Sequence, residues 1–482
     1  MNPLTILIVI ACYFALLFFI SYLAGRKADN AGFFSGNRSS NWLLVAMSTI
    51  GAAISGVTFV SVPGMVAISG WAYMQMVLGF TVGQFLIAYV LIPLYYKFNL
   101  TSIYQYLQQR FGMGTYKSGA WLFFVSKMLG ASVRLFVVSE VLQLLVFDKL
   151  AVPVPFWVNA IITVLIVYLC TFKGGVKSLI WTDLLKTCCL ILSVALCIYF
   201  VLRAGVNIEG WTCSEMTRTF FFDDPKSGNY FWKQFLAGVF LVIATTGLDQ
   251  DLMQRTLSCK NPRESQKNLI VGALMQIVVI GLFLFLGYLL YTYAAQTGVA
   301  QVASLKGDEV FPFLATGNYF PVIVGVLFII GFIAAAYSAA GGALTALTTS
   351  FTVDILNKEK ADNLTKIRTW VHIGMAILMA VCIYVIHLLN DDSVIQTVYK
   401  VASYTYGPLL GMFCFGIFTK KQVRDRWIPI AVIAAPVITW IIDVNSVAWF
   451  NGYQFSHERL ILNAALTALG MLLLIKPSKK QD

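Results

Sequence analysis

The chain has 482 residues, of which 59% are hydrophobic and only 12% are charged, and its mean hydropathy is +0.78. A soluble domain carries about 25% charged residues, so this composition excludes a soluble globular protein, and its high hydrophobicity excludes a disordered one. Because the apolar runs are continuous rather than alternating, the composition predicts a helical protein of the lipid bilayer and not a membrane β-barrel.

The hydropathy pattern predicts an all-α polytopic membrane protein with about 13 transmembrane helices, each of roughly 20 residues. In chain order, the predicted spans cover residues 3–23, 41–69, 72–97, 119–147, 154–172, 179–203, 231–255, 268–295, 322–350, 368–389, 396–418, 427–443 and 458–476.

The net charge of +12 is interpreted as a topology signal rather than as a nucleic-acid surface. Lysine and arginine are concentrated in alternate loops, and such loops stay in the cytoplasm. This bias predicts a cytoplasmic C-terminus and, with an odd number of spans, an N-terminus outside. Short loops without targeting extensions favour a bacterial inner membrane.

The sequence also restricts the class of membrane protein. It contains no phosphate-binding GxxxxGK[ST] loop, so ATP is not the expected energy source. Neither a nucleophile–base pair nor a metal cluster stands out, which disfavours an enzyme. The remaining classes are a carrier driven by an ion gradient, a passive channel or uniporter, and a sensor that binds a solute without transporting it.

Charged residues at membrane depth are costly and are therefore candidates for function. Arg134 lies within LGASVRLFVVSEVL, where its guanidinium suits capture of a carboxylate, or alternatively an internal ion pair with Glu140. Lys127 is expected to extend its amine to the membrane edge. Asp183 and Lys186, three residues apart in WTDLLKT, can pair on one helix face. Asp183 either forms a salt bridge at a helix end or faces an ion path.

Two spans have the composition of broken helices. The first, STIGAAISGVTFVSVPG, contains small residues, hydroxyls and Pro63, and the second, VIATTGLDQDLMQRTL, contains Thr245, Thr246 and Gly247 at its expected break. Non-helical backbone at this depth is tolerated where it lines a cavity, so such a pair indicates a transporter's binding site. For the first span, close packing of small residues is the alternative.

A third span, GFIAAAYSAAGGALTALTTSFTVDIL, is rich in small residues. Close helix packing explains this composition. Alternatively, Ser338 offers a hydroxyl oxygen to Na⁺, and backbone carbonyls of the first broken span complete the site.

Six segments together resemble the sodium/solute symporter family in their order along the chain. They are SGVTFVSVPG, TSIYQYLQQRFG, KGGVKSLIWTDLLKT, GLDQDLMQRTL, AAAYSAAGGALTALTTSFTVDIL and YGPLLGMFCFGIFTKK. The resemblance implies a LeuT-like core of five plus five helices in an inverted repeat, in one transmembrane domain that functions as a monomer. Its expected parts are an N-terminal helix and cytoplasmic loop at 1–40, a first repeat at 41–203, a second repeat at 231–418, and two C-terminal helices at 427–482.

The resemblance implies a sodium site and coupling to Na⁺. Its expected ligands are the carbonyls of Gly51, Ile54 and Ala335 and the hydroxyl of Ser338. A second hydroxyl that is usual in the family is missing, because Ala339 follows this serine. Coupling to protons, or none, is therefore the alternative.

Some family members hold a second sodium ion with two serines and an aspartate. Asp183 matches the aspartate, but Gly341 and Gly342 stand at the serine positions, and Lys186 stands where glutamine is common. A second sodium ion is therefore not expected.

The resemblance also implies a solute. Arg134 matches the carboxylate-binding arginine of the sialic-acid members. Sodium-coupled import of a carboxylate such as sialic acid or a sugar acid is the first expectation, and a neutral sugar is the second. The other positions expected to contact the solute are Ala53, Ser55, Thr58 and Thr245, with Tyr404 or Tyr406 as an aromatic lid.

Overall fold

The computed structural model describes residues 3–145, 147–149, 154–389, 392–453 and 455–476. Within these ranges every regular element is a helix, and strand-like pairing is limited to isolated bridges. Eight helices among the described residues are long and apolar enough to cross a membrane, and two bent helix pairs raise this number to ten. The all-helical polytopic fold is therefore confirmed.

The helices divide at the long loop that follows residue 203. Those before it are α1 (Pro3–Gly25), α2 (Asn30–Ser35), α3 (Trp42–Ala53), α4 (Gly56–Gly64), α5 (Val66–Ser69), α6 (Tyr73–Leu86), α7 (Ile92–Lys97), α8 (Gln105–Arg110), α9 (Met113–Leu145), α10 (Phe156–Thr171) and α11 (Val176–Arg203). Those after it are α12 (Phe231–Val242), α13 (Gln250–Thr256), α14 (Pro262–Thr297), α15 (Gly307–Thr316), α16 (Val322–Ser350), α17 (Leu364–Leu389), α18 (Asp392–Phe418), α19 (Ile428–Trp449) and α20 (Arg459–Leu473).

Short 3-10 and π segments join or extend these helices. The π segments are Ile87–Leu91, Ile243–Gly247 and Phe351–Ile355, and the 3-10 turns are Gly36–Arg38, Phe147–Lys149, Trp211–Cys213, Glu215–Thr217, Ala300–Ser304 and Asp425–Trp427.

Every predicted span overlaps a helix or a bent pair, and the largest differences are at helix ends. For example, α9 begins at Met113 rather than at 119, and α19 ends at Trp449 rather than at 443. The helices α10 and α20 and the apolar part of α18 at Tyr404–Phe418 occupy the places of the remaining spans. Because α10 and α20, with 16 and 15 residues, are shorter than a full membrane crossing, the count of 13 stays a prediction.

The first broken helix is the pair α3 and α4, whose axes are bent by 64°. The break lies at Ile54 and Ser55, which have extended backbone angles, and not at Pro63 in the last turn of α4. Ser55 starts the second half as its N-cap, because its hydroxyl accepts a hydrogen bond from the backbone N–H of Thr58 at 3.3 Å.

The second broken helix runs from α12 into α13 with a bend of 72°. The chain passes through the π segment Ile243–Gly247 and turns at Leu248 and Asp249, so the expected break near Gly247 is confirmed. Asp249 caps α13 by accepting a hydrogen bond from the backbone N–H of Asp251 at 2.9 Å.

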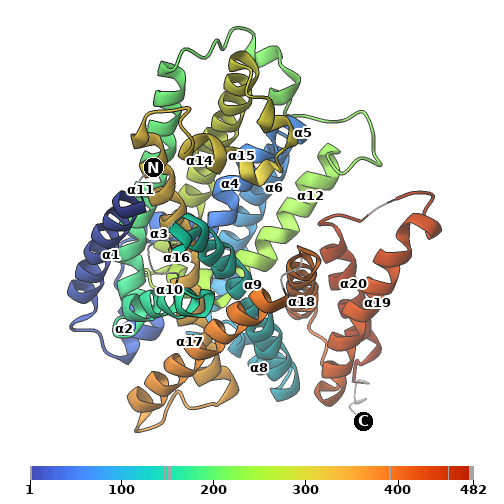
Figure 1. The fold of residues 1–482 in the computed structure, drawn as a ribbon. Coiled ribbons are helices and arrows are strands. Elements are labelled where there is room, and N and C mark those ends of the chain that lie inside the picture. Colours follow the sequence, from blue (N-terminus) through green and yellow to red (C-terminus); the bar gives the residue numbers. More distant parts are fainter. Residues whose placement is uncertain (1–2, 146, 150–153, 390–391, 454, 477–482) are drawn as a thin grey trace, which may run out of the picture.

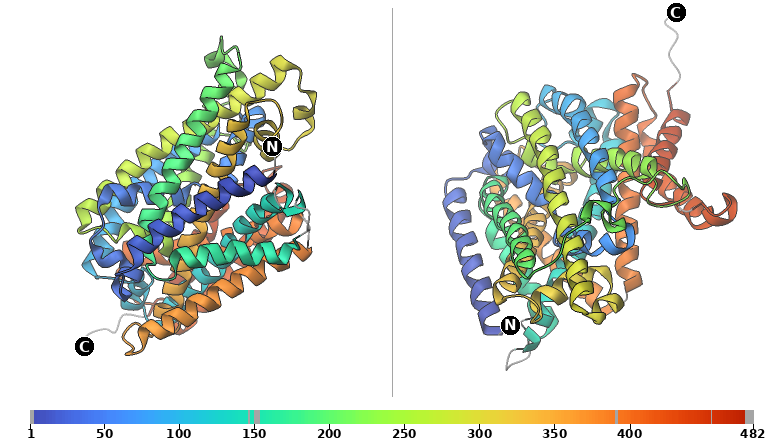
Figure 2. Two further views of the ribbon diagram at one scale, coloured as in Figure 1. Left: turned by 60° about the vertical axis from the view of Figure 1, so that its left-hand side comes forward. Right: turned by 90° about the horizontal axis from the view of Figure 1, so that it is seen from above.

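The small-residue helix α16 is the centre of the molecule, and it is packed among α11, α9, α4 and α3. From Phe332 to Ser350 every residue is buried. Small side chains allow this close approach of helices. Figure 1 shows α1 and α19–α20 on opposite sides of this bundle, and Figure 2 shows the same bundle from two further directions.

Candidate functional site

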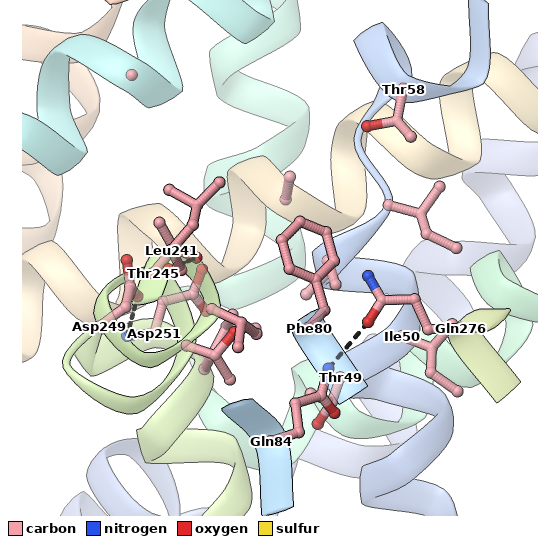
Figure 3. A pocket seen from close by; sticks show the side chains of 18 of the residues that line it. Thr49, Ile50, Thr58, Phe80, Gln84, Leu241, Thr245, Asp249, Asp251 and Gln276 are labelled. Atoms are coloured by element: carbon pink, nitrogen blue, oxygen red, sulfur yellow. Dashed lines mark hydrogen bonds between the residues drawn. The ribbon is translucent and has the colours of Figure 1, made fainter. Parts of the chain in front are cut away.

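A cavity of about 610 Å³ lies beside both broken helices. Its wall is formed by residues of α3, α4, α6, α9, α12, α13 and the break between them, α14, α16, α18, and the start of α20 with His457 before it. In Figure 3, Thr58 from α4, Gln84 from α6 and Asp249 from the second break approach the cavity from different helices. The two breaks therefore expose their polar groups to one common space.

Arg134 lines this cavity, and its side chain is exposed there. No ion pair or hydrogen bond joins it to any of the described residues. The alternative partner, Glu140, accepts a hydrogen bond from His387 instead, with 2.9 Å between Oε1 and Nδ1. Arg134 is thus a cation that lies inside a cavity and has no counter-ion among the described residues.

Of the other residues that were predicted to contact the solute, some line the cavity and others do not. Ala53, Thr58 and Thr245 line the cavity. Ser55 does not, because it caps α4. Tyr404 also lies outside the lining, since its hydroxyl donates to Asp443 Oδ2 at 2.7 Å.

Tyr406 lies in the cavity wall, as Tyr73 of α6 also does. Its hydroxyl donates to Asp249 Oδ2 at 3.0 Å. Of the two lid candidates, Tyr406 is therefore the one that is placed to contact a solute.

Lys127 does not extend to the membrane edge, and that expectation is wrong. Its amine lies 3.0 Å from Asp249 Oδ1 and 3.0 Å from Asp251 Oδ2, and its side chain is only 12% exposed. The α12–α13 break places two carboxylates within reach of α9, and a buried ion pair is more favourable than a single charge in the membrane.

Asp183 and Lys186 pair as their spacing predicts, with 3.2 Å between Lys186 Nζ and Asp183 Oδ1. Asp183 is also bound by the guanidinium of Arg255. Two hydroxyls complete its surroundings, because Ser338 Oγ donates to Oδ1 at 2.8 Å and Ser48 Oγ donates to Oδ2 at 3.0 Å. Asp183 lies outside the cavity lining.

The predicted sodium ligands occupy the packed region between α3 and α16. Ile54 is in the break, while Gly51, Ala335 and Ser338 are buried within these two helices. A Cβ atom at Gly51 would be 3.5 Å from Ser338 Oγ, so this glycine and this hydroxyl are close. That these four residues coordinate Na⁺ remains a prediction.

Sequence reasoning missed three residues of the site: Asp249, Asp251 and Arg255. A signal for all three was present in GLDQDLMQRTL, where Asp251 and Arg255 are four residues apart on one helix face. Their ion pair is observed, with 3.0 Å between Nε and Oδ1. The partnership of Arg255 with Asp183 connects α13 and α11 and had no local signal.

Two broken helices beside a central cavity in a helical membrane bundle define a secondary transporter. The model of the Sodium:solute symporter family matches residues 33–425, so the chain belongs to the sodium:solute symporter family. It is an integral membrane protein of a family in which Na⁺ is the coupling ion.

The sodium/sialic acid symporter NanT of Aliivibrio fischeri is 24% identical over 470 residues, which are 93% of this chain and 89% of that protein. The sodium-coupled monocarboxylate transporter 1 of Mus musculus is 26% identical over 83% of this chain and 66% of its own length. The sodium/iodide cotransporter of Homo sapiens is 25% identical over 82% and 62%, respectively. The chain thus spans about two thirds of these two mammalian relatives.

Two solved structures are similar in fold. A Na⁺-coupled sialic acid symporter in a substrate-bound outward-open state superimposes with a TM-score of 0.83, at 18% identity and 98% coverage of both chains. MHP1, of the nucleobase-cation-symport-1 family, superimposes with a TM-score of 0.56, at 14% identity over 92% of this chain and 94% of its own. These similarities confirm the LeuT-like transporter fold.

Proposed function

We propose that this protein imports an organic carboxylate together with Na⁺, with sialic acid or a sugar acid as the first candidate. The observation that carries the proposal is Arg134. It is a cation exposed in the central cavity, and none of the described residues supplies it with a counter-ion. A solute carboxylate can accept two parallel hydrogen bonds from its guanidinium.

The other charges of the cavity leave Arg134 as the anion-binding group. Lys127 is occupied by Asp249 and Asp251, and Arg459 is paired with Asp443 at 2.9 Å. The three named relatives transport sialic acid, monocarboxylates and iodide, and all of these solutes are anions. A net positive cavity is consistent with a solute of this kind.

The rest of the cavity suits a hydroxylated body attached to the carboxylate. Gln84 and Gln276 are joined by a hydrogen bond of 2.9 Å (Figure 3), and Thr58 adds a hydroxyl from α4. Amides and hydroxyls such as these bind sugar hydroxyls. They also fit a neutral sugar, which is therefore the second candidate.

The mechanism is alternating access around this cavity. Sodium binds between α3 and α16 and fixes the first broken helix, which also carries Ala53 and Thr58 of the cavity wall. The bound solute then favours closure, and the repeats rock about the site so that both cargoes leave on the inside. Sodium raises solute affinity by the same factor as the solute raises sodium affinity.

We expect a bacterial inner membrane, which the similarity to a bacterial symporter supports. The N-terminus is expected outside and the C-terminus in the cytoplasm because of the lysine and arginine bias of the loops. The protein is expected to function as a monomer.

Thermal unfolding of the purified protein with a solute panel tests the choice of solute. The panel contains N-acetylneuraminate, glucuronate, lactate and galactose, each with and without Na⁺ at fixed pH. We expect an acid to raise Tm in Na⁺, and Arg134→Ala to weaken its binding at least about 100-fold, since two charge-assisted hydrogen bonds contribute about 3 kcal/mol.

The exposed Arg203 at the end of α11 supplies the matched control, and Arg203→Ala should bind like the wild type. If galactose raises Tm and still does so in Arg134→Ala, the solute is a neutral sugar and not a carboxylate.

A further inference from the structure

A network of buried charges connects the cavity to Asp183. Lys127 lies on the cavity wall between Asp249 and Asp251, Asp251 binds Arg255, and Arg255 binds Asp183. Lys186 ends the network on the far side of Asp183. Its three carboxylates and three cations cancel in formal charge, so the network is neutral without an added ion.

Asp183 has no free hydrogen-bonding position. A carboxylate has about four lone-pair sites, and four protein groups occupy them. Lys186 and Ser338 bind Oδ1, while Ser48 and Arg255 bind Oδ2. The side chains of Asp183 and Arg255 are fully buried, and that of Lys186 is 2% exposed. A sodium ion could reach this carboxylate only by displacing one of these four groups, and next to the two cations it would be repelled.

Lys186 is held as an ion would be held, by oxygen atoms from more than one helix. Its amine lies 3.2 Å from Asp183 Oδ1 on α11 and 3.3 Å from the backbone carbonyl oxygen of Tyr337 on α16. The carbonyl is one residue before Ser338. The ammonium group therefore bridges the same two helices that a cation at this place would bridge.

The Arg255 guanidinium also fills the space next to Gly342. A Cβ atom built at Gly342 would overlap both Arg255 Nη2 and Asp251 Oδ1. A side chain at position 342 and the guanidinium in its present place are therefore mutually exclusive. The hydroxyl that could have served as a sodium ligand here is sterically excluded.

We propose that the Lys186 ammonium, supported by Arg255, is a built-in cation that occupies the Asp183 oxygen site and excludes a second sodium ion from it. Each transport cycle then uses a single sodium ion, bound between α3 and α16. This inference rests on the proposed sodium-coupled function, and the following experiment separates the two.

The experiment is equilibrium binding of ²²Na⁺ to the purified full chain at fixed pH without solute. We expect one sodium ion per chain in the wild type and two in Lys186→Gln, because removal of the ammonium leaves the buried network with a net negative charge that recruits a cation. Lys186→Met, which removes the charge without adding a ligand, should show the same gain if Lys186→Gln does not fold. Lys186→Arg and Lys177→Gln, on the same helix, should bind as the wild type does.

The difference in the number of bound sodium ions between variant and wild type tests the built-in cation. The number bound by the wild type tests sodium coupling. An unchanged stoichiometry in folded Lys186→Gln or Lys186→Met would overturn the built-in cation, as would two sodium ions in the wild type. A wild type that binds none while Lys186→Gln binds one would support the built-in cation and refute the proposed coupling.

Discussion

Ser338 is the residue at which the proposed sodium site meets the charged network. Its hydroxyl donates its proton to Asp183 Oδ1, so its lone pairs remain available to a cation. Its carbonyl oxygen accepts a hydrogen bond from Arg255 Nη2 at 3.4 Å. The network therefore fixes the orientation of this hydroxyl before sodium arrives, and preorganisation of this kind favours binding.

We predict that Ser338→Ala weakens sodium binding at least about tenfold, which corresponds to about 1.4 kcal/mol. The measurement is the midpoint of ²²Na⁺ binding. Ser350→Ala is a matched control, because Ser350 is also a buried serine of α16 that donates to a buried carboxylate, Asp354, at 2.7 Å. Equal effects of the two substitutions would mean that Ser338 has only a structural role.

Some residues of the site could be predicted from the sequence because their signal is local or because they stand out by charge. Asp183 and Lys186 are three residues apart, and Arg134 is one of the few charges in an apolar span. The partners of Lys127 and Arg255 depend on how the second broken helix approaches α9 and α11, which no local pattern encodes. Tyr404 and Tyr406 are two residues apart, and only the packing of α18 shows which one faces the cavity.

The break in the first broken helix is the element on which both sites depend. Ile54, a predicted sodium ligand, lies in the break itself, while Ala53 and Thr58 on either side of it line the cavity. The Ser55 cap defines where the second half begins, because it satisfies a backbone N–H of the first turn. A stable cap therefore fixes the position of the sodium site relative to the solute cavity.

For the cap of α4 we predict that Ser55→Ala lowers the free energy of unfolding by about 1 kcal/mol and also weakens sodium binding. Ser55→Asn preserves a capping side chain and should retain both properties. Thermal unfolding and ²²Na⁺ binding measure the two effects. A Ser55→Ala protein with wild-type stability would contradict the assigned role of the cap.

The helices themselves were largely predictable, because hydropathy reports the length of an apolar run directly. The position of the first break was not. Pro63 is a strong local signal for a break, but it lies in the last turn of α4, and the helix is interrupted where Ser55 can cap a new one. The second break was placed correctly because Gly247 ends the π segment directly before it.

For the whole molecule, the orientation in the membrane decides which cavity opening faces the outside. The segment between α11 and α12 contains Cys213, which is an exposed cysteine. We predict that a membrane-impermeant maleimide labels Cys213 in intact cells, because the loop charges place this segment outside. Cys213→Ser should abolish this labelling.

A reporter on the opposite side completes the topology test. Gln422 is exposed in the segment between α18 and α19, and in a C213S background Gln422→Cys should react only after the membrane is permeabilised. Labelling of Gln422→Cys in intact cells would reverse the predicted orientation.

Sodium-coupled import is tested most directly by uptake into proteoliposomes of the acid that gives the largest thermal shift. An inward Na⁺ gradient is compared with choline at fixed pH and zero membrane potential. Sodium-coupled import of a carboxylate predicts accumulation above the external concentration only with the Na⁺ gradient, and no accumulation by Arg134→Ala. Equal uptake in Na⁺ and choline would contradict sodium coupling.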